Sequence, residues 1–431
     1  MAKRLYRIGL CLTLSLVMFG CQSSPSGPQS TEVQPGDTIT ILGTLTGVGE
    51  DKLRQAMAPF TEATGVEVIY EGTDAFTTLL PVRVDSGNPP DIALFPQPGL
   101  MLDFAEAGQM APLTDFIDRA TLAEAYDEYL LNLVSLDESV YGLWMRADVK
   151  SLVWYNPKAF AAKGYTVPET WAEMDALSDR IMADGGTPWC MGMESGQASG
   201  WVGTDWVEDI LLRQAGPAVY DQWVSHEIPF SDPQVKAAFE EFGAIARNPK
   251  AVLGGTTGVI STPFGEAPRP LFDDPPGCYL HRQASFIVEF LPERVDLNSD
   301  ISVFALPPID PAQGQAVIIG GILFGVFNDT PAVRALMAYL ATPEPHAIWA
   351  GLGSYISPHR QVSLEAYPND LTRKQAEILQ KADVLRFDGS DLMPGAVGTG
   401  AFWSGMVDYV DGQDLTTALE DIDAAWPPDN R

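Results

Sequence analysis

Short apolar segments alternate with amphipathic segments over the first part of the chain. Their spacing predicts strands at 38–42, 66–70 and 91–95, and helices at 51–64, 76–84 and 99–107. This order of strand and helix predicts an α/β fold, in which helices cover both faces of a parallel sheet. Ligands of such sheets bind beyond the carboxyl ends of the strands. The loops that begin at Gly43, Gly72 and Pro96 are therefore the predicted rim of a binding site.

A second run of strands and helices follows Tyr141. The patterns predict strands at 151–155 and 189–193, and helices at 158–163, 170–182, 205–214, 233–247, 331–341, 373–382 and from 400 to the end. The apolar run 318–327 contains Gly320 and Gly321, which predict a bend where the chain crosses between two lobes. Two lobes are expected because a body of about 400 residues exceeds what one core usually supports.

The N-terminal segment has the marks of an export signal. Lys3, Arg4 and Arg7 precede an apolar run over 8–19, and Gly20-Cys21 follows directly. The run is too short to span a bilayer, which needs roughly 20 residues.

The junction at Cys21 resembles the lipobox of bacterial lipoproteins, in which the signal is cut before a cysteine that is then diacylated. This predicts a signal peptide over 1–20, lipidation of Cys21, and a flexible tether over 21–36 that is rich in Pro, Gly and Ser. The alternative is an ordinary signal peptide with a chance cysteine. The expected location is the outer face of the membrane, as an exported, anchored lipoprotein facing the periplasm or cell exterior.

The cysteine content agrees with export. Of the four cysteines, Cys11 leaves with the signal and Cys21 takes the lipid, so Cys190 and Cys278 remain. An even number in an oxidising compartment favours a disulfide, and two unpaired buried thiols are the alternative. Neither has a Cys or His at metal-ligand spacing, so no metal is expected.

The formal net charge of −31 argues against nucleic acid or anionic lipid as a partner.

Several short strings carry a family resemblance. Tyr155-Asn-Pro-Lys158, Gly164-Tyr165 and Val167-Pro-Glu-Thr-Trp171 together resemble a signature of the sugar-binding proteins of ABC importers, the class that includes the maltose-binding proteins. Three further strings are similar to the branch that binds α-glucosides and related compatible solutes. They are Glu194-Ser-Gly196, Gly203-Thr-Asp-Trp206 and Ser390-Asp-Leu-Met-Pro394.

The resemblance implies a two-lobed periplasmic-binding-protein fold with a hinge of three crossovers and a ligand cleft between the lobes. The expected lobes are 37–147 plus 322–368, and 148–321 plus 369–431. The implied partners are a small neutral sugar or glucoside, such as sucrose, trehalose or glucosylglycerol, and the permease subunits of an importer. A monomer without cofactor is expected.

A sugar site needs aromatic faces for C–H surfaces and planar polar groups for hydroxyls. Aromatic side chains expected at the rims are Trp201, Trp206, Tyr355 and Trp403, with core packing as the alternative for each. The acidic and amide candidates are Asp74, Gln97, Glu194, Gln283 and Asp391, with a solvated surface role as the alternative. Further candidates are Arg146, Lys150, Thr46 and the backbone at Gly320 and Gly321. We assign Trp154, Trp171 and Trp189 to the core.

Two other function classes compete with a binding protein. An exported glycoside hydrolase would use paired carboxylates. Because the chain is so acidic, the presence of such pairs does not distinguish a hydrolase from a binding protein. The sequence holds no Gly-x-Ser-x-Gly elbow, no His-Glu-x-x-His and no Walker loop, and its four histidines are scattered. A structural or adhesive lipoprotein is the third interpretation. We expect a binding protein and not an enzyme.

Overall fold

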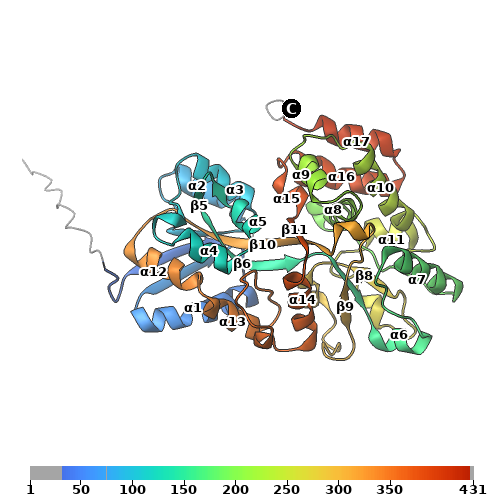
Figure 1. The fold of residues 1–431 in the computed structure, drawn as a ribbon, viewed down its shortest axis with the longest axis horizontal. Helices are drawn as coiled ribbons and strands as arrows, with labels where there is room; N and C mark the ends of the chain where they lie inside the picture. The colour runs from blue at the N-terminus through green and yellow to red at the C-terminus, as the bar shows by residue number, and fades with distance from the viewer. Residues whose placement is uncertain (1–31, 74, 428–431) are drawn as a thin grey trace, which may run out of the picture.

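The computed structural model describes residues 32–73 and 75–427, and it forms two lobes that lie side by side (Figure 1). One lobe is built mainly from the first third of the chain and from α12 (Pro331–Leu340) and α13 (Pro343–Gly351). The other is built from the middle of the chain and from its C-terminal helices. No helix in the described ranges is long and apolar enough to cross a bilayer.

The first lobe confirms the predicted alternation of strand and helix. β1 (Thr38–Gly43) pairs in parallel with β2 (Glu67–Gly72) and with β3 (Ile92–Phe95). The intervening helices are α1 (Val48–Thr64), α2 (Phe76–Asp85) and α3 (Pro98–Glu106). The carboxyl ends of β1 and β3 therefore meet at one edge of the sheet, which faces the second lobe.

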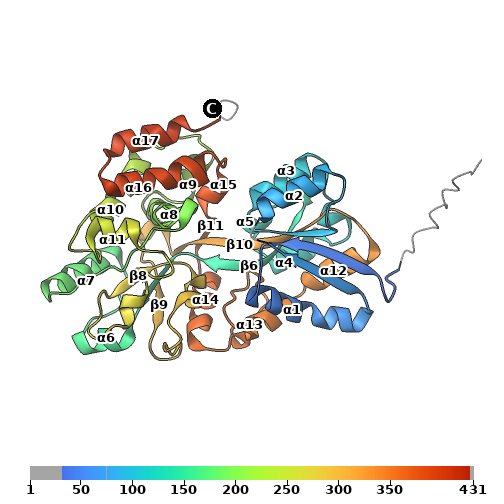
Figure 2. The ribbon, with the colours of Figure 1, turned by 180° about the vertical axis from the view of Figure 1, so that it is seen from behind.

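Two long strands join the lobes in both views (Figures 1 and 2). β6 (Gly142–Val149) runs antiparallel to β10 (Ala316–Val326). One end of β10 pairs with β3 of the first lobe, and its other end pairs with β11 (Val384–Phe387). All residues of β10 are buried, so the link between the lobes is part of the core.

The predicted bend at Gly320 and Gly321 is wrong, because β10 continues through both residues as a strand. The glycines serve a close approach instead. A Cβ at Gly321 would lie 2.3 Å from the carbonyl oxygen of Arg146, and one at Gly320 would lie 3.2 Å from the side chain of Lys150. The absence of side chains at these two positions lets β6 and Lys150, the residue after it, pack against β10.

The second lobe holds a small antiparallel sheet in the order β8 (Leu280–Arg282), β7 (Leu152–Tyr155), β9 (Ser302–Ala305). Its central helix is α8 (Trp201–Ala215), which is buried from Val202 to Arg213. The other helices of this lobe are α6 (Pro157–Lys163), α7 (Trp171–Ala183), α9 (Pro217–Val224), α10 (Pro233–Ala246), α11 (Gly255–Ser261), α15 (Gly389–Leu392), α16 (Trp403–Asp411) and α17 (Leu415–Ala424). The remaining α-helices and strands are α4 (Arg119–Ala125), α5 (Glu128–Asn132), β4 (Ser135–Leu136), β5 (Ser139–Val140) and α14 (Asp370–Gln380).

The segment 189–193, predicted as a strand, forms only isolated bridges. Its amide groups donate to three different segments: Trp189 to Ala251, Cys190 to Leu280, and Met193 to Val259. Because no single neighbour runs alongside it, no continuous ladder forms.

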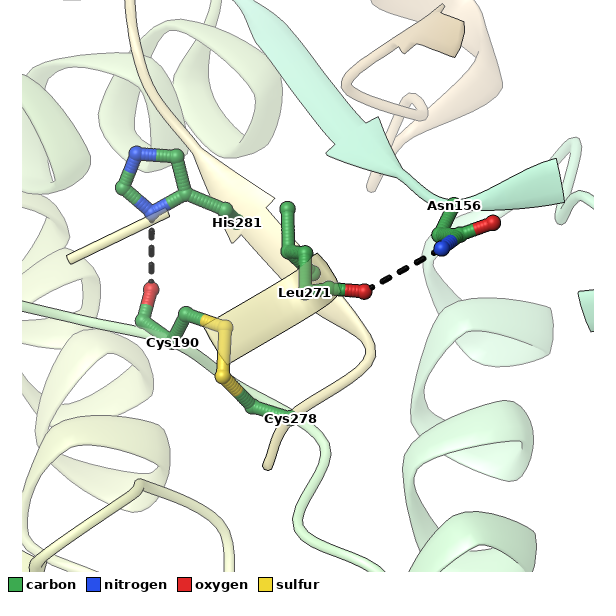
Figure 3. Close-up of a disulfide and its surroundings, with 5 residues drawn as sticks. All are labelled: Asn156, Cys190, Leu271, Cys278 and His281. Atoms are coloured by element: carbon green, nitrogen blue, oxygen red, sulfur yellow. Dashed lines mark hydrogen bonds between the residues drawn. A yellow bond between two sulfur atoms is a disulfide. The ribbon is translucent and has the colours of Figure 1, made fainter. Parts of the chain in front are cut away.

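The predicted disulfide between Cys190 and Cys278 is confirmed, with a Cα–Cα distance of 5.4 Å. Figure 3 shows it joining the 189–193 segment to the chain that leads into β8. Next to it, the Nδ1 atom of His281 lies 2.9 Å from the carbonyl oxygen of Cys190. Both cysteines are buried, so the bridge fastens two parts of the second lobe inside its core.

Candidate functional site

A cavity of about 340 Å³ lies between the lobes, on one side of the crossover strands. The first lobe contributes the loops that follow β1 and β3, as the strand-end rule predicts. The crossover strands contribute charged side chains and glycines, and the second lobe contributes aromatic and acidic side chains. The lining residues are Thr44, Leu45, Pro96, Arg146, Asp148, Lys150, Trp201, Phe286, Gly320, Gly321, Ile322, Asp388, Ser390, Asp391 and Trp403.

Strand alternation brings three charged side chains to this cavity, two from β6 and one from the residue directly after it. Arg146, Asp148 and Lys150 are two residues apart, so they share one face of the strand. A terminal nitrogen of Arg146 lies 3.0 Å from the carboxylate of Asp148. The Nε atom of Arg146 is buried and has no hydrogen-bond partner among the described residues. It is therefore a donor without a partner, on a residue that lines the cavity.

Lys150 contacts several side chains at the floor of the cavity. Its Nζ atom lies 3.0 Å from Asp205, contacts Asp388, and sits 5.6 Å from the ring centre of Trp201. Burial alone would lower the pKa of the ammonium group, but the carboxylates of Asp205 and Asp388 outweigh it and raise the pKa well above its usual value. Lys150 is therefore charged, and it holds the aromatic and acidic parts of the wall in place.

A row of buried charges continues from Lys150 into the second lobe. Asp205, Asp209 and Arg213 are spaced by four residues on α8 and so share one face of the helix. Arg282 contacts both aspartates, and Arg213 lies 2.5 Å from Asp209. Arg213 also donates to the carbonyl oxygen of Ala316 at the start of β10. The row thus connects the cavity floor to the strand that joins the lobes.

Residues 388–391 form the most constrained part of the wall. The carboxylate of Asp388 accepts from the hydroxyl of Ser390 at 2.7 Å and from the amide of Asp391 at 3.2 Å. Buried Glu208 accepts from the amides of Gly389 and Ser390. Burial, together with Asp388 and Asp205, raises the pKa of Glu208 well above its usual value.

Asp391 makes a hydrogen bond between the lobes. The amide nitrogen of the Gln97 side chain donates to its carboxylate at 3.1 Å. Burial and the charge of Asp388 raise the pKa of Asp391 to about 7.

Several predicted residues come together here. The structure places Arg146, Lys150, Trp201, Gly320, Gly321, Asp391 and Trp403 in the cavity wall, and Gln97 against Asp391. Asp74 lies outside the described residues, so its prediction stays open. The indole Nε1 of Trp403 is buried and has no partner among the described residues. Trp154, Trp171 and Trp189 are buried, as predicted.

Five predicted residues do not line this cavity. Trp206 is 1% exposed and packs edge-on against Trp189, because five residues after Trp201 a helix presents a different face. Tyr355 is buried in the first lobe, where its hydroxyl donates to the carbonyl oxygen of Met145. The side chain of Gln283 bonds the amide of Ala284, that of Glu194 bonds the amide of Gly196, and Thr46 is exposed.

The wall also contains residues that the sequence does not predict, mainly Asp148, Phe286, Asp388 and Ser390, whereas Thr44 lies in the predicted rim loop that begins at Gly43. Asp148 could have been found, because it lies between two predicted residues of one alternating strand. Ser390 begins the motif 390–394, from which the sequence predicts only Asp391 as a site residue. Phe286 and Asp388 reach the cavity only through the long-range fold, so no local pattern marks them.

Three comparisons bear on the identity of the chain. The family model for bacterial extracellular solute-binding proteins matches residues 46–347. The chain is 54% identical over 424 residues to the osmoprotective compounds-binding protein GgtB of Synechocystis, covering 98% of this chain and 100% of that protein. It is 42% identical over 399 residues to the alpha-glucosides-binding periplasmic protein AglE of Rhizobium meliloti, covering 91% and 87%.

Solved structures share the fold at lower identity. The bacterial solute receptor AcbH superposes with a TM-score of 0.76 at 19% identity, covering 90% of this chain and 98% of that one. The apo form of RafE from Streptococcus pneumoniae gives a TM-score of 0.73 at 18% identity, covering 92% and 99%. These likenesses show a two-lobed architecture common to all three chains.

Proposed function

Because the chain belongs to the family of bacterial extracellular solute-binding proteins, we propose that it captures a neutral, hydroxyl-rich glucoside between its lobes and passes it to the permease of an ABC importer. The family and the relatives named above are binding proteins rather than enzymes. The names of those two relatives, one for osmoprotective compounds and one for alpha-glucosides, support this class of ligand.

One observation carries the proposal: the cavity combines unpartnered donors, acceptors and aromatic faces. The buried nitrogens of Arg146 and Trp403 lack partners among the described residues, so each gains by donating to a ligand oxygen. Asp391 offers carboxylate oxygens to ligand hydroxyls, and the rings of Trp201 and Phe286 offer faces to C–H surfaces.

The charges of the cavity favour a neutral ligand. Arg146 is paired with Asp148, and Lys150 is paired with Asp205 and Asp388. A charged ligand would have to compete with these internal pairs and would bring its own desolvation cost. A neutral sugar can bind through the donors and acceptors that these ion pairs do not use.

The proposed mechanism is closure about the crossover strands. The proposed lobes are 37–147 plus 322–368, and 148–321 plus 369–431, so that β6 and β10 pass between them. A ligand in the cavity bridges walls from both lobes and shifts the equilibrium toward the closed form only as far as it binds that form more tightly. Closure removes water and strengthens each hydrogen bond inside. The permease would then recognise the closed form.

Calorimetry and thermal unfolding test the ligand class. The panel is sucrose, trehalose and glucosylglycerol against glycine betaine, glutamate and a dipeptide. We expect at least one glucoside to bind and to stabilise the protein, by about 2.7 kcal/mol at a ligand concentration one hundred times Kd. Binding of the amino acid, the dipeptide or glycine betaine without any glycoside would overturn the proposal.

Substitution of the two free donors should weaken glucoside binding. Trp403→Phe keeps an aromatic face but loses the buried N–H, and Arg146→Met loses the Nε donor. Each should raise Kd about tenfold, since a hydroxyl that is desolvated without a partner costs about 1–3 kcal/mol. The matched control is Trp171→Phe, because the indole of Trp171 donates to Glu241 far from the cavity. Equal Kd values for Trp403→Phe and Trp171→Phe would remove Trp403 from the site.

The lipid anchor is part of the proposal, although Cys21 lies outside the described residues. Cys21→Ser should move the protein from the membrane fraction to the soluble fraction, because the acyl chains that hold it would be lost. Cys11→Ser is the control, since that residue lies within the proposed signal and should leave the distribution unchanged. Membrane attachment that persists in Cys21→Ser would contradict the anchor.

A further inference from the structure

A second cavity of about 750 Å³ adjoins the first. It lies between α3 of the first lobe and the ends of α9 and α15 of the second lobe. Ser390 and Asp391 line both cavities. The ligand cleft is therefore a pair of compartments that share one wall.

The shared wall is completed by one side chain from the opposite lobe. Gln97 lines the second cavity, and its amide nitrogen donates to the Asp391 carboxylate at 3.1 Å. This bond spans the cleft where the two compartments meet. The bond forms a partition between the two compartments. Because its two ends belong to different lobes, the partition exists only while the lobes keep this arrangement.

Both ends of the partition are held in place. On the second lobe, Asp388 accepts from the amide of Asp391, and Glu208 accepts from the two amides before it. On the first lobe, Gln97 directly precedes Pro98, which is buried at the start of α3. These contacts fix the backbone on both sides of the bridge.

The second compartment carries groups that suit another sugar ring. Its lining includes Ser225 and Thr399, whose hydroxyls donate to nearby backbone carbonyls and can still accept, together with Asp103 and Trp426. One face of the Trp426 ring stacks on His226. Hydroxyl and carboxylate groups beside an aromatic surface are what hydroxyl-rich ligands use. The first compartment, at about 340 Å³, is near the small end of the usual range for ligand pockets.

We propose that the Gln97–Asp391 bridge determines the length of the ligand. While it is formed, it confines a short glucoside to the first compartment. Without it, a longer α-glucoside extends into the second compartment. This inference rests on the proposed function, because it takes a glucoside as the occupant of the first compartment.

Calorimetric titration of the full-length protein with matched pairs of ligands tests the proposal. The pairs are maltose with maltotriose and sucrose with glucosylsucrose. The parent should bind the longer member of a pair at least about tenfold more weakly than the shorter one. Gln97→Ala should reduce that ratio by about tenfold, because the added ring gains access to the second compartment. Gln97→Ser, whose side chain is too short to span the cleft, should behave like Gln97→Ala.

Two further variants separate the partition from general loosening. Gln109→Ala removes an exposed glutamine of the same lobe and should keep the length preference of the parent. Gly99 lines the second compartment, and a Cβ there would have no heavy atom within 4 Å. Adding Gly99→Phe to Gln97→Ala should narrow the compartment and restore part of the preference for the shorter ligand.

The outcomes distinguish the two proposals. If the parent binds no glucoside, the proposed function is wrong, and the partition proposal, which depends on it, is wrong as well. If the parent binds the shorter glucoside but binds the longer one equally well, the function stands and the partition is overturned. An unchanged ratio in folded Gln97→Ala and Gln97→Ser also overturns the partition.

Discussion

Replacing Asp209 with alanine should lower the free energy of unfolding by about 3–5 kcal/mol, because it leaves buried positive charge without its partner. Asp209 is fully buried, and its carboxylate contacts both Arg213 and Arg282 and accepts from the hydroxyl of Ser151. Burial alone would raise the pKa of this carboxyl, but the two guanidinium groups outweigh it and lower the pKa. The native protein thus holds Asp209 charged, and the two arginines depend on it.

The effect should reach the cavity as well as the core. Arg282 also contacts Asp205, which is bound to Lys150 in the cavity floor. Loss of Asp209 should therefore weaken ligand binding in addition to stability. Urea unfolding gives the first quantity from the shift in midpoint at constant slope. Calorimetry gives the second under conditions where the variant is folded.

A surface pair provides the matched control. Asp329 bonds Arg334 through both carboxylate oxygens, but the two side chains are 29% and 45% exposed. Exposed pairs contribute about 0–1 kcal/mol, so Asp329→Ala should change stability little. If both substitutions lowered the free energy of unfolding equally, burial would not explain the contribution of the Asp209 contacts to stability.

The sequence predicts those parts of the fold that repeat a local pattern. Strand and helix alternation in the first lobe follows from residues that are neighbours in the chain, and β1 to α3 appear where the pattern predicts them. The rim after β1 and β3 follows from the same rule. In contrast, the 189–193 segment has the composition of a strand but finds three different partners, which only the assembled lobe supplies.

The site shows the same limit at the level of single residues. The sequence indicates a helix from Asp205, whereas α8 begins four residues earlier, at Trp201. Without that first turn, the pattern cannot separate Trp201, which faces the cavity, from Trp206, which faces the core. Tyr355 stands in a loop that reads as a rim, but its hydroxyl bonds a carbonyl oxygen 210 residues away in sequence. Residue type therefore predicts the candidate site residues, and long-range contacts determine which of them face the cavity.

Removing the disulfide should cost about 2–5 kcal/mol of stability. Cys190 and Cys278 are 88 residues apart, and constraining a loop of that length in the unfolded chain corresponds to about 4.6 kcal/mol in the chain-entropy model. The expected variant is Cys190→Ala with Cys278→Ala, compared with the parent by urea unfolding. Reductant should lower the midpoint of the parent and leave that of the double variant unchanged. Alkylation of two thiols in the native, unreduced parent would contradict the bridge.

The same variant should leave glucoside affinity within about threefold of the parent where it is folded, less than one tenfold step. Neither cysteine lines the cavity. The bridge acts on the 189–193 segment, whose amides are also bonded to Ala251, Leu280 and Val259. Its role is therefore to stabilise the second lobe as a whole, while the buried charges and the 388–391 segment shape the wall that meets the ligand. A loss of affinity larger than tenfold in the folded double variant would instead make the disulfide part of the binding geometry.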